Sequence, residues 1–156
     1  MHIARVTDIG DAPLIVDDIT GWSDAASACS PGRDHLPNVE MLESFVANGD
    51  GHVVLAAVED DVTVGLVVCR RADGRIIWAL AHPDRYARIV VDVATVARDM
   101  IGMSVWGVVG NATLRDSLLA EDGVTRHSFY GYDSALILRT PTDGRAVSSV
   151  TVGAHV

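Results

Sequence analysis

The stretch Arg75–Val124, RIIWALAH-PD-RYARIVVDVATVARDMI-GM-SVWGVVG-NATLRDSLLAEDG-V, decides the fold. Its apolar residues alternate between continuous runs and helical repeats. The runs are rich in β-branched and aromatic residues and predict strands. The repeats, at spacings of three and four residues, predict helices with one apolar face. The predicted elements are a strand at Arg75–His82, a helix at Arg85–Ile101, a strand at Ser104–Gly110 and a helix at Ala112–Glu121.

The order strand, helix, strand indicates how these elements are arranged. Because a helix joins the two strands, we expect them to be parallel neighbours with a right-handed crossover. The loop Pro83-Asp84 then joins the carboxyl end of a strand to the N-terminus of a helix. Unpaired N–H groups and the positive end of the helix dipole lie at such a junction, where α/β proteins usually bind anions. The sequence therefore predicts an anion site beside Pro83-Asp84.

The rest of the chain adds elements on both sides of this stretch. Short links between the three middle strands predict an antiparallel meander, with Asp73-Gly74 in the favoured turn position. The order is β-α-α-β-β-β-α-β-α-β-β, an α/β (α+β) fold with a mixed central sheet. The flanking elements are a strand at His2–Val6, a helix from Asp8 or Asp11 to Gly21-Trp22, a helix at Asn38–Asn48, strands at His52–Val58 and Val62–Cys69, and a closing hairpin of Val124–Tyr130 and Ser134–Arg139 around Gly131-Tyr132-Asp133.

Length and charge restrict the class of protein. At 156 residues, 49% of them hydrophobic, the chain is long enough for one domain with a core. We expect a domain at residues 1–139 and a polar tail at 140–156 that is flexible or docks on a partner. No apolar run reaches the roughly 18 residues of a membrane span, and the N-terminus lacks a signal-peptide pattern, which predicts a cytoplasmic protein. The net charge of −9 argues against nucleic-acid binding.

Residue content excludes several kinds of chemistry. All 12 basic residues are arginines, so the chain lacks the lysine of Schiff-base and Walker-type sites. Cys29 lies in a predicted loop and Cys69 in a predicted strand, a placement that makes neither a disulfide framework nor a zinc site. The 6 histidines include no pair four residues apart, so no metal site is predicted.

Two segments resemble a known family. In Trp106–Val124, a strand ends at Asn111, a short helix follows, and Gly123 precedes the last hairpin. The segment Leu80–Arg85 reads Leu-Ala-His-Pro-Asp-Arg, similar to the end of that family's central strand. With the order of elements over residues 2–139, these segments resemble the GNAT (Gcn5-related N-acetyltransferase) superfamily. The resemblance implies a GNAT-like mixed sheet with parallel, splayed central strands.

The resemblance also implies where acetyl-coenzyme A (acetyl-CoA) would lie. In the family, the cofactor occupies the gap between the two splayed strands, here those predicted at 75–82 and 104–110. The family's phosphate motif is Gln/Arg-x-x-Gly-x-Gly/Ala. Arg85 fits its first position, whereas Arg88 and Val90 stand in place of the glycines. The implied cofactor-binding residues are Leu80, Ala81, His82, Arg85, Arg88 and Asn111.

The implied reaction transfers an acetyl group from acetyl-CoA to an amine on a small molecule or a protein. The backbone at Leu80–His82 would polarise the thioester carbonyl. Many members place a Tyr acid where this chain has Leu119, so Tyr130 and Tyr132 of the closing hairpin are the candidate proton donors. The candidate bases, by position, are His82, Glu59 and Asp60.

Structural interpretations stand beside these functional ones. His82 is also typical of a solvated turn residue, and Asn111 of a helix N-cap. Trp78 and Trp106 fit a core or the wall of a groove. The arginines fit equally well as partners of carboxylates on an exposed helix face, Arg85 with Asp84 and Arg88 with Asp92.

The replacements at Arg88, Val90 and Leu119 favour a second class of function. The chain would then be a catalytically inactive GNAT-fold binding or structural module, for example a phage virion or assembly component. A protein partner would dock on the tail at 140–156, in the host cytoplasm or the virion. Under the enzyme hypothesis, Trp22 and the loop Ser23–Pro37 lie on the acceptor side, and the acidic surface attracts a cationic amine.

Overall fold

The computed structural model describes residues 1–22, 38–109, 112–129, 132–137 and 150–151. The strands are β1 (His2–Arg5), β2 (His52–Glu59), β3 (Val62–Arg70), β4 (Ile76–Ala81), β5 (Val105–Val108), β6 (Val124–Phe129), β7 (Tyr132–Ile137) and β8 (Val150–Thr151). The helices are α1 (Ala12–Thr20), α2 (Val39–Ala47), α3 (Tyr86–Ile101) and α4 (Ala112–Leu119), with 3-10 turns η1 (Ile9–Asp11) and η2 (Pro83–Arg85).

These strands form two sheets. The larger has the order β4-β3-β2-β1-β8 and the smaller the order β5-β7-β6. The strands β2, β3 and β4 form the predicted antiparallel meander. β1 pairs antiparallel with β2, whereas β8 pairs parallel with β1. The fold is therefore α+β, and its larger sheet is mixed.

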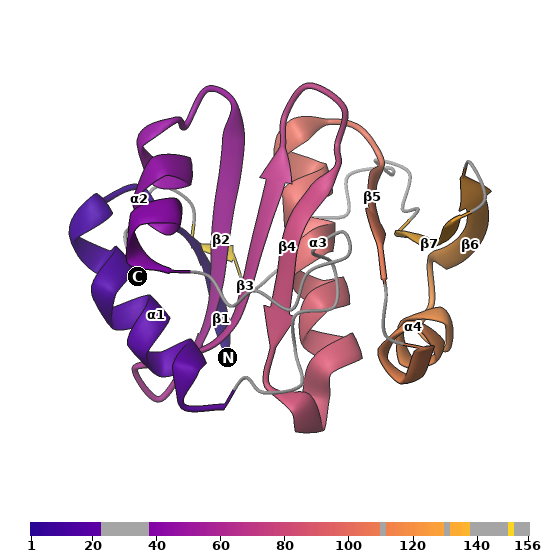
Figure 1. Ribbon diagram of the computed structural model, residues 1–156, viewed down its shortest axis with the longest axis horizontal. Coiled ribbons are helices and arrows are strands. Elements are labelled where there is room, and N and C mark those ends of the chain that lie inside the picture. The colour runs from indigo at the N-terminus through magenta and orange to yellow at the C-terminus, as the bar shows by residue number, and fades with distance from the viewer. Residues whose placement is uncertain (23–37, 110–111, 130–131, 138–149, 152–156) are drawn as a thin grey trace.

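The two strands predicted to be parallel neighbours meet at one point. Arg75 forms an isolated parallel bridge with Trp106, whose backbone N–H donates to the Gly74 carbonyl oxygen over 3.0 Å. Beyond this bridge, β4 pairs with β3 and β5 pairs with β7 within the described residues. Figure 1 shows β5 standing apart from β4 on the right of the molecule. The two strands therefore begin side by side and continue in different sheets.

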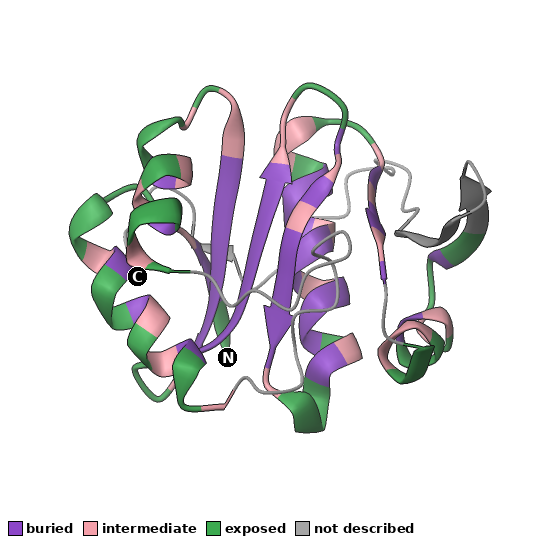
Figure 2. Cartoon of the chain, in the orientation of Figure 1, coloured by how far each residue is buried: buried purple, intermediate pink, exposed green. Residues whose placement is uncertain are grey.

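Helices cover both faces of the larger sheet, with α1 and α2 on one face and α3 on the other (Figure 1). The longest continuously buried stretches of the described residues are 53–58 of β2 and 63–69 of β3 (Figure 2). Such apolar runs are typical of strands that are buried on both faces. Phe45 of α2 meets Trp78 with 5.0 Å between ring centroids, while Ile89 of α3 packs against Gly65 from the opposite side.

Several helix ends agree with the sequence signals. The Asn38 side chain accepts a hydrogen bond from the backbone N–H of Met41 and so caps α2. Gly102 ends α3 with a φ of 81°, a left-handed conformation that glycine adopts without strain. Asp8 caps η1 through its side chain, whereas Asp11 precedes α1 without a side-chain cap. Of the two predicted caps, the structure therefore uses Asp8.

The closing hairpin differs from the prediction in its turn. Phe129 of β6 pairs with Tyr132 of β7. Tyr132 and Asp133, expected in the turn, lie in β7, and the predicted turn at Gly131-Tyr132-Asp133 is wrong. The apolar pattern alone leaves the register of this hairpin open.

The structure describes two residues of the predicted tail, Val150 and Thr151. They form β8 and pair with Ile3 and Ala4 of β1. This described part of the tail lies on the edge of the domain's own sheet. For the rest of residues 140–156, the flexible or partner-docked tail stays a prediction.

Two absences concern the described residues alone. None of the helices there has the combination of length and apolar character that crossing a bilayer requires. The same residues bring together no group of three His, Cys, Asp or Glu side chains that would suit a metal ion.

Candidate functional site

The turn η2 joins the carboxyl end of β4 to the N-terminus of α3, where the sequence predicts a ligand. Pro83 begins this turn, a position at which a missing N–H costs no hydrogen bond. The Nδ1 atom of His82 accepts from the backbone N–H of Asp84 over 3.3 Å and orders the turn. Arg85, which precedes α3, forms no side-chain cap, so its side chain leaves the first N–H groups of the helix to other acceptors.

Arg85 forms a two-pronged ion pair with Glu59 at the end of β2. The Nη1–Oε2 and Nη2–Oε1 distances are 2.9 and 3.0 Å. The hydrogen bond from Arg85 lowers the pKa of Glu59, and the same bond raises the pKa of Arg85. Arg85 thus pairs with a residue of β2, and not with Asp84, the partner expected on an exposed face. Because both side chains are substantially exposed, solvent screens the pair.

Arg88 lies on the exposed side of α3. Its Nε is 3.6 Å from the Asp92 Oδ2 atom, which is the pairing expected from the spacing along the helix. Because 75% of the Arg88 side chain is exposed, its guanidinium is accessible to a ligand. Arg88 and Asp92 also line a cavity of about 300 Å³ with Glu121 and Asp122, beyond the end of α4.

The backbone groups of β4 alternate between its two edges. The N–H of His82 donates to the Val64 carbonyl oxygen of β3 over 2.9 Å. In an antiparallel ladder, the backbone groups of alternate residues point to the same neighbouring strand, so the N–H and C=O of Leu80 also point to β3. Ala79 and Ala81 face the other edge, away from β3. Of the residues Leu80–His82, predicted to polarise the thioester carbonyl through their backbone, Ala81 therefore has its N–H on the outer edge.

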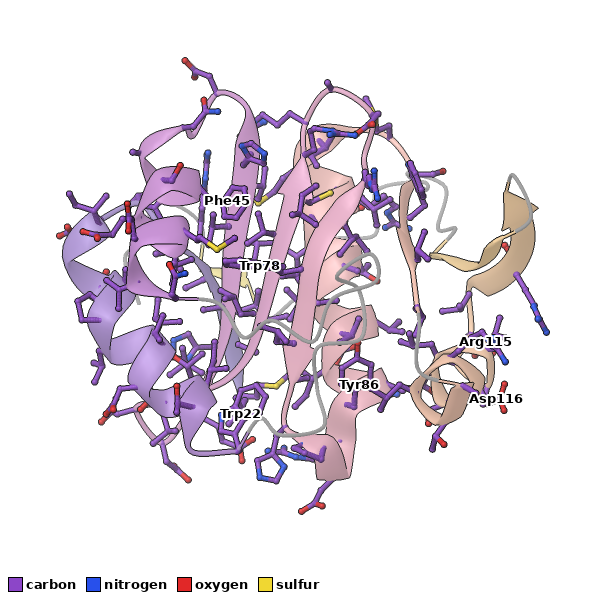
Figure 3. The ribbon with its side chains drawn as sticks, viewed as in Figure 1. Trp22, Phe45, Trp78, Tyr86, Arg115 and Asp116 are labelled. Atoms are coloured by element: carbon purple, nitrogen blue, oxygen red, sulfur yellow. The ribbon has the colours of Figure 1, made fainter. Side chains whose placement is uncertain are left out.

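Tyr86, the first residue of α3, reaches back to this outer edge of β4. Its hydroxyl donates to the Ala79 carbonyl oxygen over 2.8 Å, and the residue is 3% exposed. Figure 3 shows Tyr86 on the side of β4 that faces α4. Sequence reasoning missed this residue. It continues the apolar stripe of Ile89, Val90 and Val93, and a buried tyrosine on such a stripe usually needs a partner for its hydroxyl.

His82 lies beside Trp22, with 6.1 Å between ring centroids. The Trp22 Nε1–H donates to the Thr63 carbonyl oxygen over 3.0 Å, and the Thr63 N–H donates to Asp18 over 2.9 Å. These bonds fasten the end of α1 to β3 and bring Trp22 next to His82. Because the His82 Nδ1 atom accepts a hydrogen bond, the neutral ring carries its proton on Nε2. This arrangement supports a turn-ordering role for His82 over that of a general base.

The other two candidate bases have structural roles. Asp60 and Asp61 form the two-residue turn between β2 and β3, with φ values of 51° and 61°. Positive φ at both positions is the hairpin geometry that Asp tolerates through local hydrogen bonding. Glu59, immediately before this turn, binds Arg85.

Some predicted site residues fall outside the described part of the chain. Asn111 and Tyr130 do so, as does the loop Ser23–Pro37. For Tyr132, the structure gives the backbone position opposite Phe129. Leu119, at the family's Tyr position, is partly buried against the core at the end of α4. The proton-donor role of Tyr130 or Tyr132 stays a prediction.

Comparisons with known proteins find a likeness among solved structures. No family model matches the chain, and no curated protein matches its sequence. Among solved structures, the chain is similar to yncA of Salmonella typhimurium, described as a "putative acetyltransferase" with its cofactor acetyl-CoA. The identity is 17%, the match covers 94% of this chain and 96% of that one, and the TM-score is 0.49.

Proposed function

We propose that this chain binds acetyl-CoA at the β4–α3 junction and transfers the acetyl group to an amine. The isolated parallel bridge from Arg75, the residue before β4, to Trp106 of β5 is the observation that carries the proposal. Past this contact, the outer edge of β4 approaches the N-terminus of α3 without a strand partner among the described residues. A pantetheine chain can hydrogen-bond its amides to such an edge, and a pyrophosphate binds at such a helix end.

The residues at the helix end fit an anion by charge. Arg85 and Arg88 lie at the start of α3 with exposed guanidinium groups. Arg85 forms an ion pair with Glu59. Because exposed ion pairs are weak, phosphate oxygens can replace the Glu59 carboxylate. Arg85, Arg88 and the first N–H groups of α3 would hold the pyrophosphate. When bound, acetyl-CoA supplies the thioester whose acyl group is transferred.

At the acetyl end, the chain offers the backbone of Ala81 on the outer edge of β4. An N–H there would stabilise the negative charge that develops on the carbonyl oxygen during attack by the amine. Trp22 and His82 would border the acceptor from the other side. The net charge of −9 attracts cationic amines, on a small molecule or on a protein.

A second function, that of a binding module without catalysis, has an observation of its own. The groups that acetyl-CoA would use are partly satisfied within the chain, because Tyr86 binds the Ala79 carbonyl and Glu59 binds Arg85. In that case, the junction is closed by the chain's own side chains. The two functions differ in whether acetyl-CoA displaces these contacts.

Calorimetric titration with acetyl-CoA separates the two functions. Binding is expected for the wild type, and Arg85→Ala should weaken it roughly tenfold, because a charge-assisted phosphate contact is lost. Arg70→Ala is the matched control, since Arg70 forms a similar exposed pair with Asp73 at the other end of the sheet. Absence of binding at millimolar acetyl-CoA would exclude the acetyltransferase. Equal weakening by both variants would exclude a specific contact at Arg85.

A further inference from the structure

A second cavity, of about 370 Å³, lies at the end of the sheet opposite the β4–α3 junction. It is enclosed by the end of β1, the loop from α2 to β2, and the residue that follows β3. Phe45 and Trp22, labelled in Figure 3, lie towards the two opposite ends of the sheet. The polar and aromatic residues that line this cavity are Arg5, Phe45, Gly49, Asp50, His52 and Arg71.

Two guanidinium groups in this cavity converge on one neutral acceptor. The Arg5 Nη2 atom donates to the Gly49 carbonyl oxygen over 3.1 Å, and the Arg71 Nε atom donates to the same oxygen over 3.0 Å. A guanidinium has five N–H donors, and each arginine uses one of them here. Within the described part of the chain, neither Arg5 nor Arg71 forms an ion pair. The cavity therefore holds two cations with most of their donors uncommitted.

The loop around Gly49 does not need two arginines to hold it. The backbone N–H of Asn48 donates to Ser44, and that of His52 donates to the Asn48 carbonyl over 3.0 Å. The backbone N–H of Arg71 also donates to Gly51 over 2.9 Å. These bonds order the loop independently of the guanidinium groups. A purely structural role thus leaves the second arginine unexplained.

The charges around the cavity leave it positive. Burial lowers the pKa of Arg5, repulsion by Arg71 lowers it further, and attraction by Asp50 raises it. Asp50 is an exposed residue of the lining. Burial and then Arg70 lower the pKa of His52, so its ring is neutral near pH 7. Arg70 itself is held by Asp73 at 2.6 Å. Two guanidinium charges therefore face one carboxylate.

We propose that this cavity binds a small organic anion, with its carboxylate or phosphate group between Arg5 and Arg71 and its apolar part against Phe45. Guanidinium groups present paired donors that match the oxygens of either group. Phe45 is partly exposed and packs edge-on against His52, with 4.9 Å between ring centroids, so it offers an apolar wall beside the cations. This site is separate from the β4–α3 junction and does not depend on the proposed acetyl transfer.

Nuclear magnetic resonance of the ¹⁵N-labelled full chain tests the proposal directly. The protein is titrated with benzoate and, separately, with inorganic phosphate at constant ionic strength. The expected result is a saturable shift of the Gly49, Gly51 and His52 amide signals, with the Thr125 and Arg126 amides of β6, in the smaller sheet, unmoved. Saturation by benzoate indicates a carboxylate on an apolar body, and saturation by phosphate alone indicates a phosphate ligand. Shifts that do not saturate with either probe, or that spread evenly over the chain, overturn the proposal.

Variants identify the residues responsible. Arg71→Gln should weaken binding of the probe roughly tenfold or more, because one charge-assisted contact is lost. Arg5→Gln should have a similar effect, and Arg126→Gln, at an exposed position of β6 in the smaller sheet, should have none. If Arg5→Gln proves unstable, Arg71→Lys keeps the charge but loses the paired donors and should bind with intermediate affinity. Unchanged affinity in Arg71→Gln overturns the assignment.

Discussion

The guanidinium of Arg85 and the carboxylate of Glu59 meet through two hydrogen bonds of 2.9 and 3.0 Å, across 26 residues of sequence. The pair connects the end of β2 to the start of α3, at the place where an anionic ligand is expected. Glu59 is therefore the internal competitor of a phosphate group for Arg85. Because the pair is exposed, this competition is weak enough for a ligand to reverse.

Glu59→Gln should strengthen binding of acetyl-CoA several-fold. The variant removes the carboxylate that holds Arg85 and lowers the negative charge near the pyrophosphate. Calorimetric titration measures the effect. Asp73→Asn is the matched control, because it breaks the comparable pair with Arg70 far from the junction. Weaker binding by Glu59→Gln would show that Glu59 supports the ligand instead of competing with it.

Tyr86→Phe should lower the free energy of unfolding by about 0.5–1.5 kcal/mol, because a buried hydroxyl no longer donates to the Ala79 carbonyl. Urea unfolding measures this loss. If pantetheine amides use the outer edge of β4, the variant should bind acetyl-CoA at least as tightly as the wild type. Unchanged stability of Tyr86→Phe would contradict the hydrogen bond. If the variant loses the expected stability but binds acetyl-CoA more weakly than the wild type, the hydroxyl belongs among the ligand contacts.

How far the sequence predicts this site depends on how local each contact is. The pairing of Arg88 with Asp92 follows from helical spacing, and the turn at Pro83 follows from the chemistry of proline. The pairing of Arg85 with Glu59 does not follow from local sequence, because it requires the ends of β2 and β4 to lie at the same end of the sheet. The antiparallel meander implies that proximity, but not which carboxylate the guanidinium reaches.

The same distinction applies to the fold. Apolar runs and helical repeats predict most element positions within a few residues, as for the helix predicted at Asn38–Asn48 and observed as α2. The separation of β5 from β4 has no local signal. It depends on which strands complete each ladder, and here β7 pairs with β5. Periodicity predicts elements, whereas strand partners depend on contacts across the whole domain.

Asp73 should make stability fall in acid. The hydrogen bond from Arg70 lowers the pKa of Asp73 from 3.8 to about 2. A carboxylate with a depressed folded-state pKa stabilises the fold above its unfolded pKa, and this contribution is lost as the pH falls from about 4 to about 2. The difference in Tm between wild type and Asp73→Asn should therefore be constant near neutral pH and shrink towards about pH 2. Because the pair is exposed, we expect a difference of a few degrees at most.

Thermal unfolding from neutral pH down to about pH 2 follows this difference. Glu59→Gln serves as a comparison at the other end of the sheet, since Glu59 also has a lowered pKa through a bond with arginine. A difference for Asp73→Asn that persists unchanged at the lowest pH would show that the ionised carboxylate does not stabilise the fold.

Gly65→Ala should destabilise the protein by about 1–3 kcal/mol, because the new methyl overpacks the contact between β3 and α3. A Cβ atom at this position would lie 2.5 Å from the Ile89 Cγ2 atom. Ile89→Leu moves the branch away from Cβ and should relieve the clash, so the double variant should be more stable than the sum of the single effects. Urea unfolding of all four proteins measures the coupling, and strict additivity would contradict the contact. Since Gly65 pairs with Ala81 beside the junction, Gly65→Ala should also displace the start of α3 and weaken acetyl-CoA binding, which the Ile89→Leu change should restore.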